Sequence, residues 1–299
     1  MSHERMNIQE ILQRDSRQLQ AALDLDASSA RIEVQCLLQK VLKVNRAYLL
    51  THPERLLSTD ENLNYGALLE RRMTGEPVAY LLGEREFYGL NFKVTPATLI
   101  PRPDTELLVE LALQQIPSSP APLLQAGEGG RKAGRGFRVL DMGTGSGAIA
   151  ISVAHARPDI EVVAVDASEA ALDVAKYNAQ TLKVHNVRLL HSDWFAALSD
   201  ECFDIVVSNP PYIETDDMHL SRMSFEPISA LASGGDGLDD IRRISAEAMH
   251  HLYPGGRLML EHGYSQAEKV RELLLQSGFS EVSSVRDLSG IERVTMGSA

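Results

Sequence analysis

From Arg138 onward, short apolar runs alternate along the chain with segments of helical periodicity. The runs have the length and the β-branched content of buried strands. This alternation constrains the fold strongly, because strands separated by helices form a parallel sheet that helices cover on both faces. The sequence therefore predicts an α/β domain with strands at 139–142, 161–165, 187–190, 203–207, 257–260, near 282–285 and near 293–296, and helices at about 147–156, 168–181, 241–252 and 265–277.

The first 76 residues are expected to form a helical bundle instead. Their apolar residues fall at helical spacing in three stretches, 8–23, 34–42 and 65–73. Residues 77–98 then alternate between polar and apolar side chains and carry aromatics, with Gly83 and Gly89 among them. This pattern predicts a β-hairpin that links the bundle to a second domain at 99–299.

Two further segments precede the expected sheet. The stretch from Leu99 to Glu106 places Arg102 between two prolines and leads into a helix, with Thr105 or Asp104 as the candidate cap. We interpret Arg102 as a cation near a carboxylate or carbonyl at the domain junction, with an ordinary surface charge as the alternative. Residues 117–136 combine prolines, glycines and basic side chains, which predicts a flexible loop.

Composition excludes several classes of protein. The hydrophobic content of 44% and the charged content of 23% are typical of a soluble globular protein. No apolar stretch approaches the roughly 18 residues of a membrane span, and the N-terminus has no apolar core of a secretory signal. We therefore expect a cytoplasmic protein that has no membrane partner. The net charge of −12 argues against stable nucleic-acid binding and favours a protein or small-molecule substrate.

The two cysteines, Cys36 and Cys202, lie far apart in the sequence and form no CxxC pattern. In a cytosolic protein, such cysteines are usually reduced and buried. We expect no metal site. We also expect a monomer, as the default for a protein of this kind.

A glycine-rich turn, Asp141-Met142-Gly143-Thr144-Gly145-Ser146-Gly147, follows the first expected strand. Glycines allow the backbone to approach a ligand closely, and the start of the next helix supplies free N–H groups. Asp166 ends the second strand, where a carboxylate can accept hydrogen bonds from both hydroxyls of a ribose. Both a nicotinamide dinucleotide and S-adenosyl-L-methionine fit these residues, since Gly143, Gly145 and Ala148 also satisfy a loose dinucleotide fingerprint.

Three features favour S-adenosyl-L-methionine, with S-adenosyl-L-homocysteine as the product. Asp141 places an anion at the start of the turn, which suits a sulfonium and an ammonium and would repel a pyrophosphate. Asp193 and Trp194 follow the third strand and offer a carboxylate for an exocyclic amine and an aromatic wall for adenine. The third feature is Asn209-Pro210-Pro211-Tyr212, after the fourth strand, at the sheet edge where open α/β folds bind ligands.

This proline-rich segment predicts the chemistry of the acceptor. Its two prolines fix the backbone and remove two N–H donors, so the Asn209 side chain and nearby carbonyls stay free to accept hydrogen bonds. We hypothesise that the Asn209 oxygen and the Pro210 carbonyl each accept one N–H of a planar NH2 group, and that Tyr212 offers an aromatic face to a flat substrate group. A proline-rich turn without function is the alternative for this segment taken alone.

Together these residues resemble the peptide chain release factor glutamine methyltransferases over nearly the full length of the chain. The resemblance is carried by Gly75-Glu76-Pro77, Arg85-Glu86-Phe87, Leu99 to Glu106, Asp141 to Gly147, Ser192 to Phe195, Asn209 to Tyr212, Phe225-Glu226-Pro227, Gly234 to Leu238, Glu261-His262-Gly263, Asp287 and Glu292-Arg293-Val294.

The resemblance implies a class I methyltransferase fold, with a seven-stranded, mostly parallel sheet that contains one antiparallel strand. A helical domain at 1–76 would precede it and recognise the substrate. That substrate would be the glutamine of the Gly-Gly-Gln motif in class I release factors. The family pattern places Gly143 to Gly147, Asp166, Trp194 and Asn209 on the cofactor, and Asn209 to Tyr212 on the glutamine.

The chain departs from the family pattern in two places. The segment 117–136 looks like an insertion, and Ser224 stands where an arginine commonly precedes the Phe225-Glu226-Pro227 triplet. Three alternatives remain open at this point. They are a ribosomal-protein glutamine methyltransferase, a methyltransferase for an exocyclic amine of nucleic acid, and a cofactor-binding regulator without activity. His262 is a possible base, although a lone histidine at a strand end is more often structural.

Overall fold

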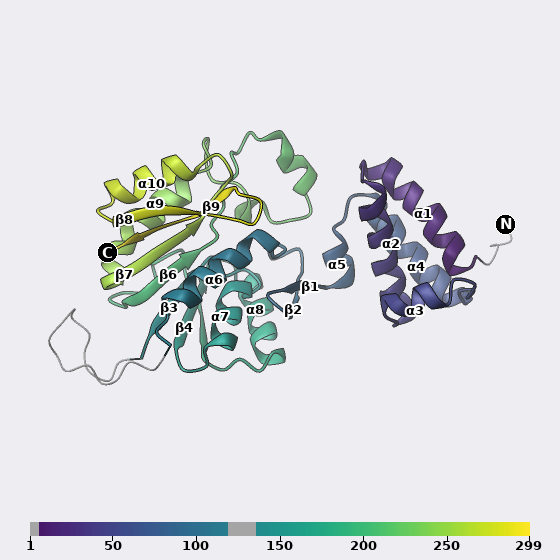
Figure 1. The fold of residues 1–299 in the computed structure, drawn as a ribbon, viewed down its shortest axis with the longest axis horizontal. Coiled ribbons are helices and arrows are strands. Elements are labelled where there is room, and N and C mark those ends of the chain that lie inside the picture. The colour runs from purple at the N-terminus through teal and green to yellow at the C-terminus, as the bar shows by residue number, and fades with distance from the viewer. Residues whose placement is uncertain (1–5, 119–135) are drawn as a thin grey trace. The chain divides into compact units, whose positions relative to one another are not determined.

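The computed structural model describes residues 6–118 and 136–299. The flexible loop predicted at 117–136 therefore lies almost wholly outside the described residues. The chain forms two compact units that divide between Glu84 and Arg85. Each unit is described by itself (Figure 1).

The first unit is helical, as the sequence predicts. Its helices are α1 (Ile8–Leu23), α2 (Ala27–Leu42), α3 (Arg46–Thr51), α4 (Thr59–Met73) and α5 (Val78–Leu82). The expected capping box forms at the start of α4, where Ser58 accepts from the Glu61 N–H and the Glu61 carboxylate accepts from the Ser58 N–H. Apolar side chains of all five helices pack into one core. Helical periodicity correctly predicted α1, α2 and α4, whose apolar stripes pack into this core, but it did not predict the short helix α3, in which Leu49 alone is buried.

The predicted hairpin is shorter than expected, and the prediction of strand at 78–82 is wrong. These residues form α5, which begins after Pro77 and ends at Gly83, where φ is +77°. Proline suits the start of a helix and glycine its left-handed end, so the two residues delimit one helical turn. The hairpin consists of β1 (Glu84–Phe87) and β2 (Leu90–Lys93).

The second unit contains a seven-stranded sheet of order β5-β4-β3-β6-β7-β9-β8. All neighbours pair in parallel except β9, which is antiparallel to β7 and to β8. Helices α6, α7 and α8 cover one face of the sheet, and α9 and α10 cover the other (Figure 1). The predicted class of fold is thereby confirmed, including the single antiparallel strand.

The elements of this unit follow the predicted order closely. The strands are β3 (Arg138–Met142), β4 (Glu161–Asp166), β5 (Val187–His191), β6 (Phe203–Ser208), β7 (Leu252–Glu261), β8 (Ser280–Arg286) and β9 (Glu292–Ser298). The helices are α6 (Glu106–Gln115), α7 (Ala148–Ala156), α8 (Glu169–Thr181), α9 (Asp239–Ala248) and α10 (Ala267–Gln276), with short 3-10 turns at Pro103–Thr105, Met218–Met223, Ile228–Ala230 and Met249–His251. In the part of the chain that the structure describes, no helix is long and apolar enough to cross a bilayer.

The order of the strands places the functional segments at one edge. Strands β4 and β5 lie on one side of β3, and β6 and β7 lie on the other, so the connections reverse direction between β3 and β6. Met142 of β3 pairs with Ser208 of β6, and the Ser208 hydroxyl donates to the Met142 carbonyl at 2.7 Å. The glycine-rich turn and the Asn209 segment therefore leave the sheet side by side, at the switch point where open α/β sheets bind ligands.

Candidate active site

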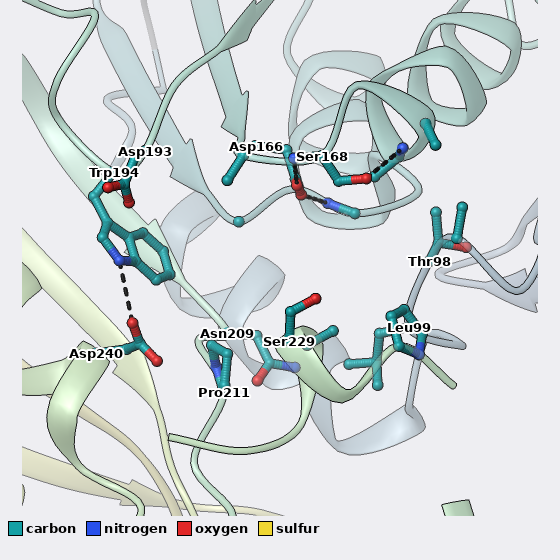
Figure 2. A pocket seen from close by; sticks show the side chains of 18 of the residues that line it. Thr98, Leu99, Asp166, Ser168, Asp193, Trp194, Asn209, Pro211, Ser229 and Asp240 are labelled. Atoms are coloured by element: carbon teal, nitrogen blue, oxygen red, sulfur yellow. Dashed lines mark hydrogen bonds between the residues drawn. The ribbon is translucent and has the colours of Figure 1, made fainter. Parts of the chain in front are cut away.

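A cavity of about 610 Å³ opens at this edge of the sheet. Asp166 and Ser168 lie on one side of it, and Asn209, Pro211 and Ser229 lie on the opposite side (Figure 2). Its lining comprises Ala97, Thr98, Leu99, Gly143, Gly145, Asp166, Ala167, Ser168, Ala170, Ala171, Ser192, Asp193, Trp194, Asn209, Pro211, Pro227, Ser229, Ala230, Asp240 and Arg243.

The glycine-rich turn forms one wall of the cavity. Gly143, Gly145 and Gly147 all have φ between +57° and +83°, a region that other residues enter only at a cost. Gly143 approaches the ring of Trp194, because a Cβ on Gly143 would lie 3.4 Å from that ring. At Gly147, a Cβ would lie only 2.6 Å from Ile151 Cδ1. The turn thus needs glycine both for its backbone conformation and for the packing beneath it.

Asp141, Thr144, Ser146 and Gly147 do not line the cavity, although the sequence analysis placed all four on the cofactor. The Asp141 carboxyl is fully buried and accepts hydrogen bonds from the Thr144 hydroxyl at 2.6 Å and the Ala150 N–H at 3.1 Å. Burial raises the pKa of Asp141 to about 7. In this structure, Asp141 ties the glycine-rich turn to the start of α7.

Asp166 reaches the cavity from the end of β4. One carboxylate oxygen accepts from the Gly145 N–H and the other from the Ser168 N–H, both at 2.8 Å. Burial raises the pKa of Asp166, and these two hydrogen bonds oppose that rise. The carboxylate is thereby held in one orientation at the cavity wall.

Asp193 and Trp194 form the side wall after β5. The indole N–H of Trp194 donates to Asp240 at 3.2 Å (Figure 2). Asp240 also accepts from the Ser233 hydroxyl at 2.7 Å. The Asp193 carboxylate lines the cavity but is paired in bidentate fashion with Arg243, at 2.9 and 2.8 Å. The sequence suggested a free carboxylate at Asp193, whereas the structure shows one that shares a guanidinium.

Asn209 stands opposite the glycine-rich turn. Its Nδ2 donates to the Thr105 hydroxyl at 3.1 Å. Its Oδ1 is buried and accepts no hydrogen bond from any described residue. Since a buried acceptor without a partner is costly, this oxygen is a candidate to accept a hydrogen bond from a ligand.

The other residues of the proline-rich segment differ in their positions. Pro211 lines the cavity, whereas Pro210 is buried and does not belong to the lining. Tyr212 is half-buried beyond the lining, and its pKa is raised by burial and by the nearby Glu261 carboxyl. The Tyr212 carbonyl accepts from Gln266 Nε2 at 3.0 Å, which ties this turn to the start of α10.

Arg102 lies near a carboxylate, as the sequence interpretation proposed, but it does not line the cavity. It pairs at 2.5 Å with Glu226, whose side chain is 4% exposed. Glu226 also accepts from the Ile100 N–H at 3.0 Å. This pair therefore joins the segment before α6 to the turn that carries Pro227 and Ser229 into the cavity.

Sequence reasoning missed several lining residues, among them Ser229, Asp240 and Arg243. The motifs Phe225-Glu226-Pro227 and Gly234 to Leu238 lie beside them in the sequence and were the only signal. His262 is fully buried, and its ring nitrogens contact the Thr295 hydroxyl at 2.8 Å and the Gly263 carbonyl at 3.0 Å. These contacts support the structural interpretation of His262. Among the described residues, no cluster of three or more histidine, cysteine or acidic side chains could hold a metal ion.

Comparisons with known proteins bear on both units. The family model of the PrmC N-terminal domain matches residues 10–83, and that of the methyltransferase small domain matches residues 131–238. The fold of the chain is similar to that of a methyltransferase from Pyrococcus furiosus, with a TM-score of 0.50 and 18% identity over 78% of this chain and 98% of that one. It is also similar to the hMettl16 catalytic domain, solved in complex with MAT2A 3′UTR hairpin 6, with a TM-score of 0.53 and 15% identity over 85% and 92% of the two chains. These two structures support the class I methyltransferase fold and nothing more.

Several curated relatives are much more similar in sequence than these two solved structures. The release factor glutamine methyltransferase of Escherichia coli strain K12 is 42% identical over 294 residues, which cover 98% of this chain and 99% of the relative. Those of Pseudomonas aeruginosa and Bordetella pertussis are 46% and 47% identical, over 91% of this chain and 94% and 96% of the relatives. At this identity and coverage, the chain belongs to the family of release factor glutamine methyltransferases.

Proposed function

We propose that this protein transfers the methyl group of S-adenosyl-L-methionine to the side-chain amide nitrogen of the glutamine in the Gly-Gly-Gln motif of class I peptide chain release factors. The observation that carries the proposal is the buried Oδ1 of Asn209, which has no hydrogen-bond partner among the described residues. Asn209 lines the cavity that Gly143 and Asp166 also line. An acceptor of this kind matches the N–H of a primary amide, and the names of the curated relatives supply the substrate.

The cavity residues fit S-adenosyl-L-methionine. A Cβ on Gly145 would meet no atom within 4 Å, so the backbone there is open to a close ligand. Each oxygen of Asp166 accepts a hydrogen bond from a backbone N–H and retains a lone pair for a ribose hydroxyl. Trp194 offers an aromatic wall, and Asp193 can take an exocyclic amine if Arg243 shares its carboxylate. When bound, this cofactor supplies an electrophilic methyl group.

Asn209 and Pro210 are proposed to activate the acceptor. An amide nitrogen is a poor nucleophile, because its lone pair is delocalised into the carbonyl group. If Asn209 Oδ1 and the Pro210 carbonyl each accept one N–H, the nitrogen is held with its π face toward the methyl group. Both acceptors also stabilise the positive charge that builds on the nitrogen, which is electrostatic preorganisation, and fixed alignment lowers the barrier further.

The remaining side chains are proposed to shape the acceptor pocket. Pro211 contributes to the cavity wall, and Tyr212 is proposed to present its ring to the flat amide. Arg102 is proposed to act on the substrate side indirectly, because its pair with Glu226 holds the turn that contains Ser229.

The helical unit at the N-terminus is proposed to contact the release factor. It exposes apolar side chains, with Leu50 at 56%, Leu56 at 52% and Leu63 at 60%. Contiguous exposed apolar patches mark protein-binding surfaces, and we propose that these leucines contribute to one. The proposed substrate places the reaction in the cytoplasm, and we propose that the enzyme acts as a monomer without stable nucleic-acid binding.

The test is the transfer of labelled methyl from S-adenosyl-L-methionine to a purified class I release factor. Parallel reactions contain the Gln→Ala variant of its Gly-Gly-Gln motif, a mixture of ribosomal proteins, and bulk RNA and DNA. We expect label on the wild-type factor alone. Label on ribosomal protein or nucleic acid, with none on the release factor, would overturn the substrate while leaving the role of Asn209 to be tested on the new acceptor.

A further inference from the structure

The orientation of the Asn209 amide depends on one hydroxyl group. Thr105 is 3% exposed and lies at the junction between the 3-10 turn Pro103–Thr105 and α6. Its side chain makes no capping hydrogen bond to the helix. Instead, its oxygen accepts from Asn209 Nδ2 at 3.1 Å, which leaves Oδ1 as the end of the amide without a partner among the described residues.

The same hydroxyl also contacts Glu261, at the end of β7. The Glu261 carboxyl is 2% exposed and forms a side-chain hydrogen bond with Thr105. A threonine hydroxyl has a single proton to donate. When Glu261 is ionised, it can only accept, so Thr105 donates to Glu261 and must accept from Asn209. The carboxylate thereby decides which end of the Asn209 amide faces Thr105.

The surroundings of Glu261 argue against a purely structural ion pair. The charged and titratable groups that face it are Asp104 and Arg102 before α6, Arg293 on β9, and Tyr212 after β6. Both arginines are already engaged elsewhere. Arg102 pairs with Glu226, and Arg293 pairs with Asp104 and Asp287, each at 3.1 Å.

One oxygen of Glu261, Oε2, is buried without any hydrogen-bond partner among the described residues. A buried carboxyl group in this state destabilises the fold. Buried titratable groups that destabilise the fold are found more often at functional sites than in purely structural cores. Its hydrogen bond to Thr105 is therefore the contact that connects Glu261 with the reaction.

We infer that Thr105 and Glu261 are positioning residues for methyl transfer: ionised Glu261 directs the Thr105 hydroxyl, and that hydroxyl holds Asn209 with its oxygen toward the acceptor nitrogen. This inference rests on the proposed function for its meaning in catalysis. Protonation of Glu261 allows its carboxyl to donate to Thr105 instead. The hydroxyl proton then points at Asn209, and the amide turns its NH2 group toward the substrate, where it opposes the N–H donors of a primary amide.

If ionised Glu261 positions Asn209, the turnover of the enzyme should depend on pH. Burial and the nearby Asp104 carboxylate raise the pKa of Glu261 to about 7, and Thr105, Arg293 and Arg102 oppose that rise. Turnover should therefore increase as the pH rises through this value, because the glutamine amide itself does not titrate there. Asp141 has a pKa in the same range, so the comparison must be made between proteins that differ at residue 261 alone.

The experiment compares the full-length wild-type protein with Thr105→Val, Thr105→Ser and Glu261→Gln. Thr105→Val keeps the shape and removes the hydroxyl, so we expect kcat to fall by about tenfold or more, with little change in cofactor affinity. Thr105→Ser restores the hydroxyl and should recover most of the turnover. Glu261→Gln can still accept from Thr105, and its kcat should no longer rise through neutral pH.

A second measurement needs no substrate. In 15N-labelled protein, the side-chain amide signals of Asn209, assigned through Asn209→Asp, report its hydrogen bond directly. We expect them to shift in Thr105→Val and to titrate near neutral pH in the wild type but not in Glu261→Gln. Wild-type turnover and unshifted signals in Thr105→Val, or an unchanged pH profile in Glu261→Gln, would overturn the inference. An inactive wild type would overturn the proposed substrate alone, since the amide signals would still report the orientation of Asn209.

Discussion

The two sides of the cavity are built in different ways. On the cofactor side, the contacts of the glycine-rich turn join residues that are close in the sequence: Asp141 holds Thr144 and Ala150, and Asp166 holds Gly145, 21 positions away. The side wall differs, because Trp194 contacts Asp240 over 46 positions and Asp193 contacts Arg243 over 50. On the acceptor side, Asn209 contacts Thr105 over 104 positions, and Arg102 contacts Glu226 over 124. The glycine-rich turn is therefore a local motif, whereas the acceptor side exists only once the domain has folded.

This difference also concerns hydrogen bonding. Both oxygens of Asp166 have partners, whereas Asn209 Oδ1 has none among the described residues. Asp141 Oδ1, beneath the glycine-rich turn, is also buried without a partner, but Asp141 does not line the cavity, so Asn209 Oδ1 is the buried unpaired acceptor among the described lining residues. Unpaired buried groups cost stability, so they persist where function requires them. The comparison predicts that substitutions on the acceptor side lower turnover more than stability, and that those on the cofactor side do the reverse.

Asn209→Ala should have the largest effect of the variants considered. Loss of the acceptor oxygen removes a preorganised electrostatic contact, and we expect kcat to fall by about 10² to 10³ fold. Affinity for S-adenosyl-L-methionine, measured by calorimetry, should change little. The matched control is Asn91→Ala, an exposed asparagine on β2, which should retain wild-type turnover. If Asn209→Ala kept normal turnover, the proposed role of the acceptor side would be wrong.

The contrast also explains what the sequence could predict. Most strands and the glycine-rich turn were predicted to within about two residues, because periodicity and glycine spacing are local properties. Asp166 and Trp194 were found in the cavity wall for the same reason. The exception among the strands is β7, which begins at Leu252 instead of 257, because α9 ends at Ala248 and not at 252 as expected. The short segment 78–82 was wrongly predicted as strand, since five residues are too few for alternation to be distinguished from one helical turn.

The acceptor side was predictable only in part. Asn209 and Pro211 were found through their position after a strand, yet the partners of Asn209 were not. Thr105 was one of two candidates, with Asp104, to cap α6, whereas its hydroxyl contacts Asn209 and makes no capping hydrogen bond. Nothing in the local pattern indicates a contact over 104 positions, because it depends on how α6 packs against the sheet. The pairing of Asp193 with Arg243 was missed for the same physical reason.

Gly147→Ala tests the cofactor side. The residue has φ of +83°, and an added Cβ would lie 2.6 Å from Ile151 Cδ1 and 3.2 Å from Ala175 Cβ. We expect the free energy of unfolding to fall by about 2–3 kcal/mol, from backbone strain and overpacking together. Urea denaturation measures the loss.

Gly145→Ala is the control, because no atom lies within 4 Å of its Cβ position, and backbone strain alone should cost about 1 kcal/mol. Equal losses in both variants would contradict the packing argument.

The free energy of unfolding should depend on pH through Asp141, on the cofactor side. Burial raises its pKa to about 7, whereas an unfolded chain has a value of about 3.9. Between these values the folded protein binds a proton that the unfolded chain has released, so this group's contribution to stability is lost as the pH rises through 7. Between pH 5.5 and 8, the wild type should lose about 2 kcal/mol of unfolding free energy relative to Asp141→Asn.

Urea denaturation of both proteins at several pH values measures this difference. Asp159→Asn is a suitable control, because Arg157 holds the pKa of that exposed carboxyl below its usual value. Its difference from the wild type should not vary over the same range. A difference between the wild type and Asp141→Asn that stays constant with pH would show that Asp141 is ionised in the folded protein at all these values.

The smallest expected effect is that of Arg102→Gln, which tests whether a long-range ion pair holds the acceptor side. The variant leaves the Glu226 carboxylate, 4% exposed, without its cation, but Arg102 itself is 37% exposed and water screens the pair. We therefore expect a loss of about 1–2 kcal/mol in the free energy of unfolding.

Arg243→Gln is the matched control, because both partners of its pair with Asp193 are largely exposed, at 45% and 60%, and its loss should stay below about 1 kcal/mol. Adding Glu226→Gln to Arg102→Gln should recover part of the stability, since no buried charge is then left unpaired. If Arg102→Gln cost no more than Arg243→Gln, the turn that carries Ser229 would be held by its apolar packing, and the acceptor side would depend less on distant charges than its contacts indicate.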